Sequence, residues 1–269
     1  MEEIDSESKF IWRLILAILA TPFTFIMMLF GKRALNDLLR PFGLMLEFLF
    51  QAKATIIIIL LNIIIFTAML FVNDKIISLF LNYPSDLLSV RIFTIITSGF
   101  MHASISHLLF NMLALFIFGR VVEKSFGVNK FLAIYFGALV LSNIISSIIH
   151  LFIFNQNIAG VGASGAIYGL IAAAMLIAPF YITYELIIPL PITVVGWLTI
   201  ATDISDILMQ VDDGVGHFAH LAGFFSVVMI LYMIEDDKER LRKGLLINAF
   251  TLVIGIIAYL WMNDWKIAI

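Results

Sequence analysis

Apolar segments long enough to cross a lipid bilayer recur along this chain, and they limit the folds open to it more than any other feature. Backbone polar groups in lipid must be paired within the protein, so such segments form helices. The chain is 62% hydrophobic and only 13% charged over 269 residues, which leaves too little polar surface to coat a soluble protein. We predict an all-α polytopic membrane protein whose spans are residues 54–72, 103–119, 131–153, 163–182, 186–201, 217–234 and 245–262.

The distribution of basic residues predicts the orientation of these spans across the membrane. If residues 1–53 are cytoplasmic, thirteen of the sixteen Lys and Arg residues lie on the cytoplasmic side, as the positive-inside rule requires. Residues 11–30 fit an eighth span or an interfacial helix equally well, because a proline interrupts them and a mixed polar segment follows. The predicted division is an N-terminal cytoplasmic or interfacial segment (1–53), a six-helix core (54–234), and a cytoplasmic loop with one extra C-terminal transmembrane helix (235–269).

Charge and cysteine content exclude several classes of function. The net charge is −3 and no basic cluster occurs, which argues against a nucleic-acid partner. The chain has no cysteine, so it has no disulfide, no thiolate zinc site and no cysteine nucleophile. The apolar spans make the lipid bilayer the first predicted partner, and the predicted location is the cell membrane.

Polar residues inside predicted spans are costly in lipid and therefore informative. The second, fourth and sixth spans all begin on the outer side, and His107, Ser164 and His220 each lie roughly one to two turns into one of them. Each residue alone is explained by packing or by a hydrogen bond between helices. Three polar groups at one depth predict a functional site. The other intramembrane polar residues are His102, Asn111, His150, Tyr168 and His217.

Serine chemistry fits this set better than the alternatives. A metal site lacks the HExxH motif and, with Asp203 assigned to an outer loop (202–216), lacks a carboxylate at the right depth. Aspartyl catalysis fails for the same reason. A serine hydroxyl needs a base within hydrogen-bonding reach, and His220 can serve Ser164. With no buried acid expected, the two would act as a dyad, without metal or cofactor.

The neighbours of Ser164 have predicted supporting roles. Tyr168 follows one helical turn later, where its ring could stack on the His220 imidazole. His107, the Asn111 amide and the Ser164 backbone N–H are the donors available to a tetrahedral oxyanion. Small residues let the fourth and sixth spans approach closely, and these are Gly162, Gly165, Gly216, Ala219 and Gly223.

The motifs resemble those of the rhomboid family of intramembrane serine proteases. The segment "HASISHLLFNM" (102–112) is similar to the family's H-x-x-x-x-H-x-x-x-N motif, "GASGAIYG" (162–169) to its G-x-S-G motif, and "AHLAG" (219–223) to its A-H-x-x-G motif. The resemblance covers about residues 90–234 and implies a six-helix core with an added helix. Arg91 follows a valine where the family often has Trp-Arg in its first outer loop.

The resemblance also implies roles for these residues. Ser164 would be the nucleophile, His220 the base, His107 and Asn111 the oxyanion hole, and His102 a structural or water-retaining neighbour. The implied activity is cleavage of single-pass transmembrane proteins near the outer membrane face, without a cofactor. Two other functions stay open: a rhomboid-like pseudoenzyme that binds membrane clients without cutting them, and a small transporter or metal permease that uses the histidines.

Overall fold

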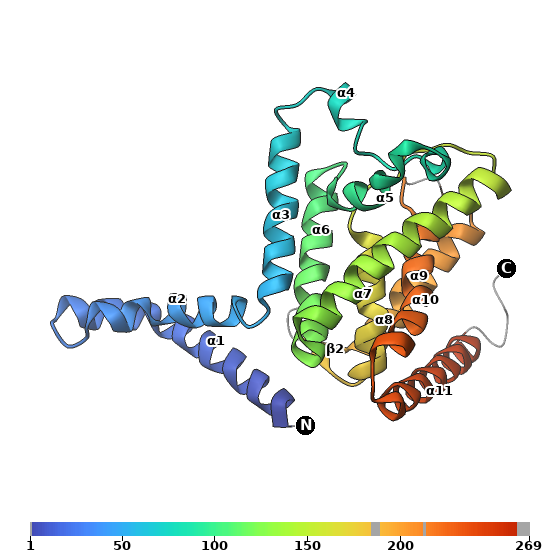
Figure 1. The fold of residues 1–269 in the computed structure, drawn as a ribbon. Helices are drawn as coiled ribbons and strands as arrows, with labels where there is room; N and C mark the ends of the chain where they lie inside the picture. The colour runs from blue at the N-terminus through green and yellow to red at the C-terminus, as the bar shows by residue number, and fades with distance from the viewer. Residues whose placement is uncertain (1, 184–188, 212–213, 263–269) are drawn as a thin grey trace. The chain divides into compact units, whose positions relative to one another are not determined.

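The computed structural model describes residues 2–183, 189–211 and 214–262, almost all of them helical (Figure 1). It divides into two compact units, Met1–Ile56 and Ile57–Ile269. The α-helices are α1 (Glu2–Leu29), α2 (Leu35–Leu49), α3 (Lys53–Met69), α4 (Asp74–Ile77), α5 (Thr94–Thr97), α6 (Ile105–Ala114), α7 (Arg120–Ile148), α8 (Ser164–Ile177), α9 (Ile192–Leu208), α10 (His217–Ile234) and α11 (Lys238–Met262). The remaining elements are the 3-10 turns η1 (Pro84–Leu88), η2 (Val90–Phe93) and η3 (Ser98–Phe100), the π-helical turns η4 (Leu115–Gly119) and η5 (Ile149–Ile153), and the antiparallel pair β1 (Ile182–Thr183) and β2 (Leu190–Pro191).

The predicted all-α polytopic membrane fold is confirmed. Within the described part of the chain, four helical runs are long and apolar enough to cross a membrane: Trp12–Leu29, Ile105–Ile153, His217–Ile234 and Lys238–Met262. The second comprises two helices, because Gly127 has a φ of +77° and breaks the run between the spans predicted at 103–119 and 131–153. Residues 12–29 pass the same test by length and composition, so an eighth span there stays a prediction.

Two of the predicted core spans differ from the helices found, and α11 begins at Lys238, seven residues before the predicted start at 245. The helix α8 has only 14 residues, about 21 Å at 1.5 Å per residue, and Ser164 is its first residue. The helix α9 begins at Ile192 and continues to Leu208, so it extends seven residues beyond the predicted end at 201. The first residues of that predicted span, 186–188, lie outside the described residues.

The core of the second unit is the contact of α7, α8 and α10 through small residues (Figure 1). A Cβ added at Gly223 of α10 would lie 2.0 Å from the carbonyl oxygen of Gly165 on α8. A Cβ at Gly169 would lie 2.3 Å from the Cβ of Ala138 on α7. Close approach of this kind gives transmembrane helices the van der Waals contact that holds them together in lipid. The helix α8 is therefore enclosed by its neighbours.

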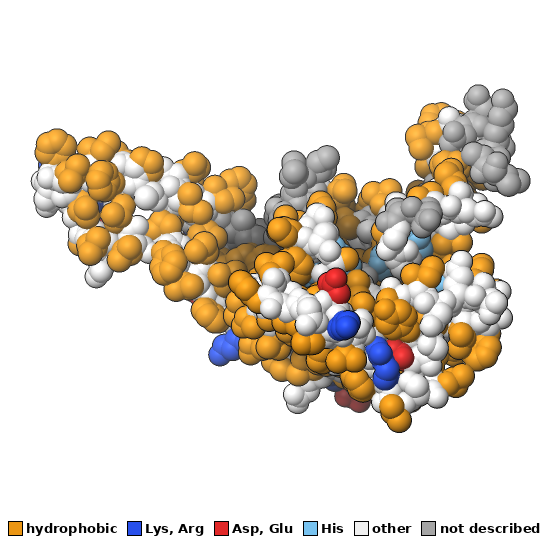
Figure 2. Space-filling model, turned by 90° about the horizontal axis from the view of Figure 1, so that it is seen from above, with side chains coloured by type: hydrophobic (Ala, Val, Ile, Leu, Met, Phe, Trp, Pro, Cys, Tyr) orange, Lys and Arg blue, Asp and Glu red, His pale blue; other side chains and the backbone are white. Residues whose placement is uncertain are grey.

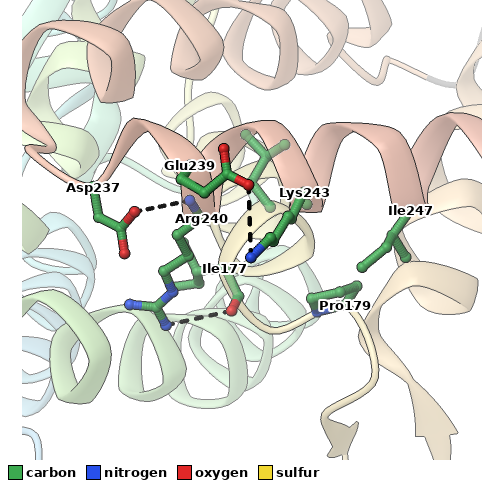
Figure 3. Close-up of a pocket in the computed structure, with 9 residues that line it drawn as sticks. Ile177, Pro179, Asp237, Glu239, Arg240, Lys243 and Ile247 are labelled. Atoms are coloured by element: carbon green, nitrogen blue, oxygen red, sulfur yellow. Dashed lines mark hydrogen bonds and ion pairs between the residues drawn. The ribbon is translucent and has the colours of Figure 1, made fainter.

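A hydrogen bond from Arg240 of α11 caps the far end of α8 (Figure 3). The guanidinium of Arg240 on α11 donates to the carbonyl oxygen of Ile177 at 3.3 Å, and the backbone N–H of Arg240 donates to Asp237. A cation at a helix C-terminus pairs with carbonyls that have no partner within the helix. Lys243 and Glu239 form an ion pair at 3.6 Å beside a cavity of about 320 Å³. Two acidic and two basic side chains line this cavity, so their charges balance each other.

Buried polar side chains tie α9 and α8 to α11. Asn248 on α11 donates to the Met175 carbonyl of α8 at 2.7 Å and accepts from the Thr193 hydroxyl of α9 at 2.7 Å. The indole N–H of Trp197 donates to the Thr251 hydroxyl at 3.2 Å. The extra C-terminal helix thus makes direct hydrogen bonds to two helices of the core.

The connection between α3 and α6 consists of short helical turns organised around Arg91. The guanidinium pairs with Asp86 at 3.3 Å and donates to the Ser78 carbonyl at 2.8 Å. Apolar side chains here are exposed, including Leu88 and Val90. The face seen from above shows many hydrophobic side chains and few charged ones, and histidine side chains are visible on it (Figure 2).

The glycine contact between α8 and α10 makes a prediction for stability. We expect Gly223→Ala to lower the free energy of unfolding by about 1–3 kcal/mol, because the new methyl group would meet backbone that no rotamer change can move. Thermal unfolding in detergent measures this change. Gly255→Ala on α11 is the matched control, since a Cβ there meets nothing within 4 Å. Equal melting temperatures for the two variants would contradict the contact.

Candidate functional site

Ser164 lies at the first turn of α8, and the preceding residues fix where that helix begins. Gly162 adopts a φ of +116°, which favours glycine, and its N–H donates to the Ser98 carbonyl of η3 at 2.9 Å. The first N–H groups of a helix have no partner within it, and the helix dipole favours negative charge there. The Ser164 hydroxyl therefore stands where backbone donors are available to an oxyanion.

His220 lies in the first turn of α10 and is 8% exposed. Its imidazole stacks on the Tyr168 ring with centroids 4.2 Å apart and planes 13° from parallel. The predicted stacking is therefore present. Tyr168 follows Ser164 by one turn on the same helix face, so the stack brings the imidazole alongside the serine's face of α8.

The close contact of α8 and α10 holds Ser164 and His220 at neighbouring positions. Gly165 of α8 directly follows Ser164, and Ala219 of α10 directly precedes His220. A Cβ added at Gly165 would lie 3.6 Å from the carbonyl oxygen of Ala219. Among the described residues, the Ser164 hydroxyl and His220 form no direct hydrogen bond. Hydrogen bonds of this kind are often long in the free enzyme and tighten when substrate binds.

His107 reaches the serine from α6. A Cβ at Gly162 would lie 2.8 Å from the Cε1 and Nε2 atoms of His107 and 3.8 Å from the Ser164 Oγ, so glycine leaves the imidazole room beside the hydroxyl. The Asn111 side chain donates to the His107 carbonyl at 2.9 Å, so one N–H of its amide is already engaged. His107, Ser164 and His220 all lie in the first turn of their helices, less far along them than predicted.

His102 supports His107 from the segment before α6. The two rings meet edge to face with centroids 5.0 Å apart, and His102 is 2% exposed. The His102 ring is thus packed inside the protein beside His107, and its structural role stays a prediction.

The expectation that no acid lies near His220 is wrong. The helix α9 continues past the predicted start of the loop, so Asp203 is a helical residue and is 3% exposed. Its Oδ1 atom lies 2.6 Å from the Nδ1 of His217 and 3.1 Å from the Nδ1 of His220. A signal was present in the sequence: Gly196, Ile200 and Asp203 follow the spacing of one helix face, and all three are buried.

The argument made against a metal site is wrong on the same point. Asp203, His217 and His220 each offer a ligand atom, and these atoms lie within 4.8 Å of one another. The two contacts to Asp203 have the lengths of direct hydrogen bonds. A metal ion would have to replace these bonds, because the donors now point at the carboxylate itself. The geometry favours a hydrogen-bonded cluster.

Comparison with known proteins identifies the family. The family model for the rhomboid domain matches residues 89–236, more than half of the chain. The chain belongs to the rhomboid family. Relatives include "RHOMBOID-like protein 12, mitochondrial" of Arabidopsis thaliana, 28% identical over 58% of this chain and 48% of that protein. "Putative rhomboid protease YdcA" of Bacillus subtilis is 28% identical over 54% and 69%, and "Rhomboid protease GlpG" of Photorhabdus laumondii is 31% identical over 44% and 39%.

The matched region of this rhomboid contains every element of the site. The segments that carry His102, His107, Ser164, Asp203 and His220 all fall within residues 89–236. The matches span about half of the first relative's length, and the relatives carry both protease and rhomboid-like names. Family membership therefore makes this chain a multi-pass integral membrane protein and supports serine protease chemistry at the family level.

The stacked tyrosine makes a prediction for the site. We expect Tyr168→Leu to slow reaction of Ser164 with a serine-directed fluorophosphonate, because the aliphatic side chain no longer provides a flat surface for the His220 ring. Tyr168→Phe is the matched control, which keeps the ring and removes only the hydroxyl. The rate of probe labelling measures both variants. A leucine variant as fast as the phenylalanine variant would show that the stack does not position the histidine.

Proposed function

We propose that this rhomboid is an intramembrane serine endopeptidase that cleaves single-pass transmembrane proteins near the outer membrane face. The observation that carries the proposal is the placement of His220 against Tyr168, one turn from Ser164, where α8 and α10 approach backbone to backbone. A serine, an imidazole and oxyanion donors around one point are what acyl transfer requires.

The proposed reaction follows from these groups. The Ser164 Oγ attacks the scissile carbonyl carbon while its proton passes to the His220 imidazole. His107, Asn111 and the Ser164 backbone N–H face the developing oxyanion. His220 then returns the proton to the leaving amine, which departs as the acyl-enzyme forms. Water, activated by the same imidazole, releases the second product and restores the serine.

The short helix α8 explains how this chemistry can take place inside a bilayer. A helix of 14 residues is about 21 Å long, less than the hydrocarbon thickness of roughly 30 Å. The charge distribution supports a cytoplasmic N-terminus and a start of α8 on the outer side, and the proposal includes the cell membrane as the location. Ser164 would then lie below the outer surface, where a transmembrane substrate must unwind to reach it.

A serine-directed probe tests the proposal without knowledge of the substrate. We expect the purified protein to be labelled by a fluorophosphonate, and Ser164→Ala and His220→Ala to abolish labelling, because nucleophile and base are both needed. Ser226→Ala is the matched control, a buried serine of α10 whose hydroxyl donates to the Gly223 carbonyl of its own helix. An unlabelled wild type, beside an active rhomboid that labels, would favour the client-binding pseudoenzyme.

Substrate access makes a second prediction, centred on α9. Trp197 holds this helix to α11 through Thr251 and packs against Phe224 of α10, with ring centroids 6.3 Å apart. If substrates enter beside α9, Trp197→Ala should increase cleavage of a single-pass reporter protein by loosening both contacts. Val194→Ala is the control, since Val194 lies on the exposed side of the same helix. Cleavage that is unchanged or slower in the tryptophan variant would count against entry at this helix.

A further inference from the structure

We propose that Asp203 is a positioning residue for His220, so that serine, histidine and aspartate work as one unit in this rhomboid. The inference rests on the proposed function of Ser164 and His220. It adds an acid on α9 to a nucleophile on α8 and a base on α10, so that three neighbouring helices each supply one member.

The carboxylate is buried, and its Oδ1 atom accepts two hydrogen bonds. Asp203 is 3% exposed, and His217 and His220 are each 8% exposed, so water scarcely reaches the cluster. A buried carboxylate must be paired or strongly hydrogen-bonded to remain charged. The Nδ1 atoms of the two histidines, at 2.6 and 3.1 Å, supply that pairing.

This arrangement determines which nitrogen of His220 carries the proton. An ionised carboxylate only accepts hydrogen bonds, so the His220 Nδ1 must carry a hydrogen. The neutral imidazole then has its lone pair on Nε2, the one nitrogen left to take the serine's proton. Without Asp203, nothing else among the described contacts of His220 would select this tautomer.

The ring is held on its face and at its edge. Tyr168 stacks on the face at 4.2 Å, and Asp203 binds the Nδ1 edge. His217 is bound to the same Oδ1 atom and so holds the carboxylate in place. Stacking fixes the plane of the ring but still permits a half-turn about the Cβ–Cγ bond, which would exchange Nδ1 and Cδ2. The hydrogen bond to Asp203 favours the orientation that keeps Nδ1 at the carboxylate.

The carboxylate also stabilises the charged form of the base. When the Ser164 Oγ forms its bond to the scissile carbon, the O–H bond breaks and the proton becomes bonded to His220 Nε2. The resulting imidazolium carries its positive charge beside the Asp203 carboxylate, which stays ionised throughout. No further reactant is needed, because the proton is later given to the leaving amine.

The position of the imidazole proton is the most direct test. In the full-length protein with ¹⁵N-labelled histidine, we expect nuclear magnetic resonance to show His220 protonated on Nδ1, its signal being assigned by its loss in His220→Gln. In Asp203→Asn the amide can donate to Nδ1, so the proton should move to Nε2. Fluorophosphonate labelling should then slow by roughly 10²- to 10⁴-fold. Asp203→Glu keeps the carboxylate and should restore the Nδ1 proton.

The controls separate this inference from the proposed function. Asp206→Asn removes the same charge from the next turn of α9, and no contact described for His220 involves this carboxylate, so labelling and tautomer should stay unchanged. If wild type is not labelled, the proposed function fails, while the spectrum still decides the role of Asp203. An Nε2 proton on His220 in wild type, or labelling of a folded Asp203→Asn variant at the wild-type rate, would overturn the inference. If that variant does not fold, the wild-type spectrum decides alone.

Discussion

The close approach of α8 and α10 at Gly165 and Gly223 is the contact on which the rest of the site depends. A single methyl group at Gly223 would stand 2.0 Å from the Gly165 carbonyl oxygen, so these two backbones pack without any side chain between them. The contact lies one residue after Ser164 and three residues after His220. Helices joined in this way fix the serine and the imidazole relative to each other at the cost of allowing almost no substitution.

The fold and much of the site could be predicted from the sequence, because lipid leaves few alternatives. A chain this apolar must pair its backbone within helices, and polar residues that remain among them stand out. Ser164, His220, Tyr168 and His107 were found in this way, and the structure brings them together. Their roles in catalysis remain proposals that the geometry supports.

Asp203 was missed because the end of a helix is hard to place from sequence. Several polar residues follow Ala201, which resembles the start of a loop, yet α9 continues to Leu208. The rule that charged residues avoid the membrane then assigned Asp203 to the outside. It overlooked that a carboxylate can be buried when two imidazoles donate to it, since those bonds replace its water. The periodicity of buried residues along α9 was the better guide.

The acid lies on a different helix from the base, and this separation links the site to the packing of α9. On α9, Thr193 hydrogen-bonds to Asn248 of α11, and Trp197 hydrogen-bonds to Thr251 of α11. The extra helix α11 therefore helps to position α9 and, with it, Asp203. The pair Ser164 and His220 belongs to the rigid contact of α8 and α10, whereas the acid depends on polar bonds between α9 and α11.

A structure of the fluorophosphonate adduct tests the central claim most directly, because it shows the nucleophile, the base and the oxyanion site at once. The account predicts phosphorus bonded to the Ser164 Oγ, the phosphonyl oxygen directed toward His107 and the Ser164 backbone N–H, and the His220 ring still lying between Tyr168 and Asp203. An adduct on another serine, or a phosphonyl oxygen directed away from His107 with His220 turned from the serine, would contradict it.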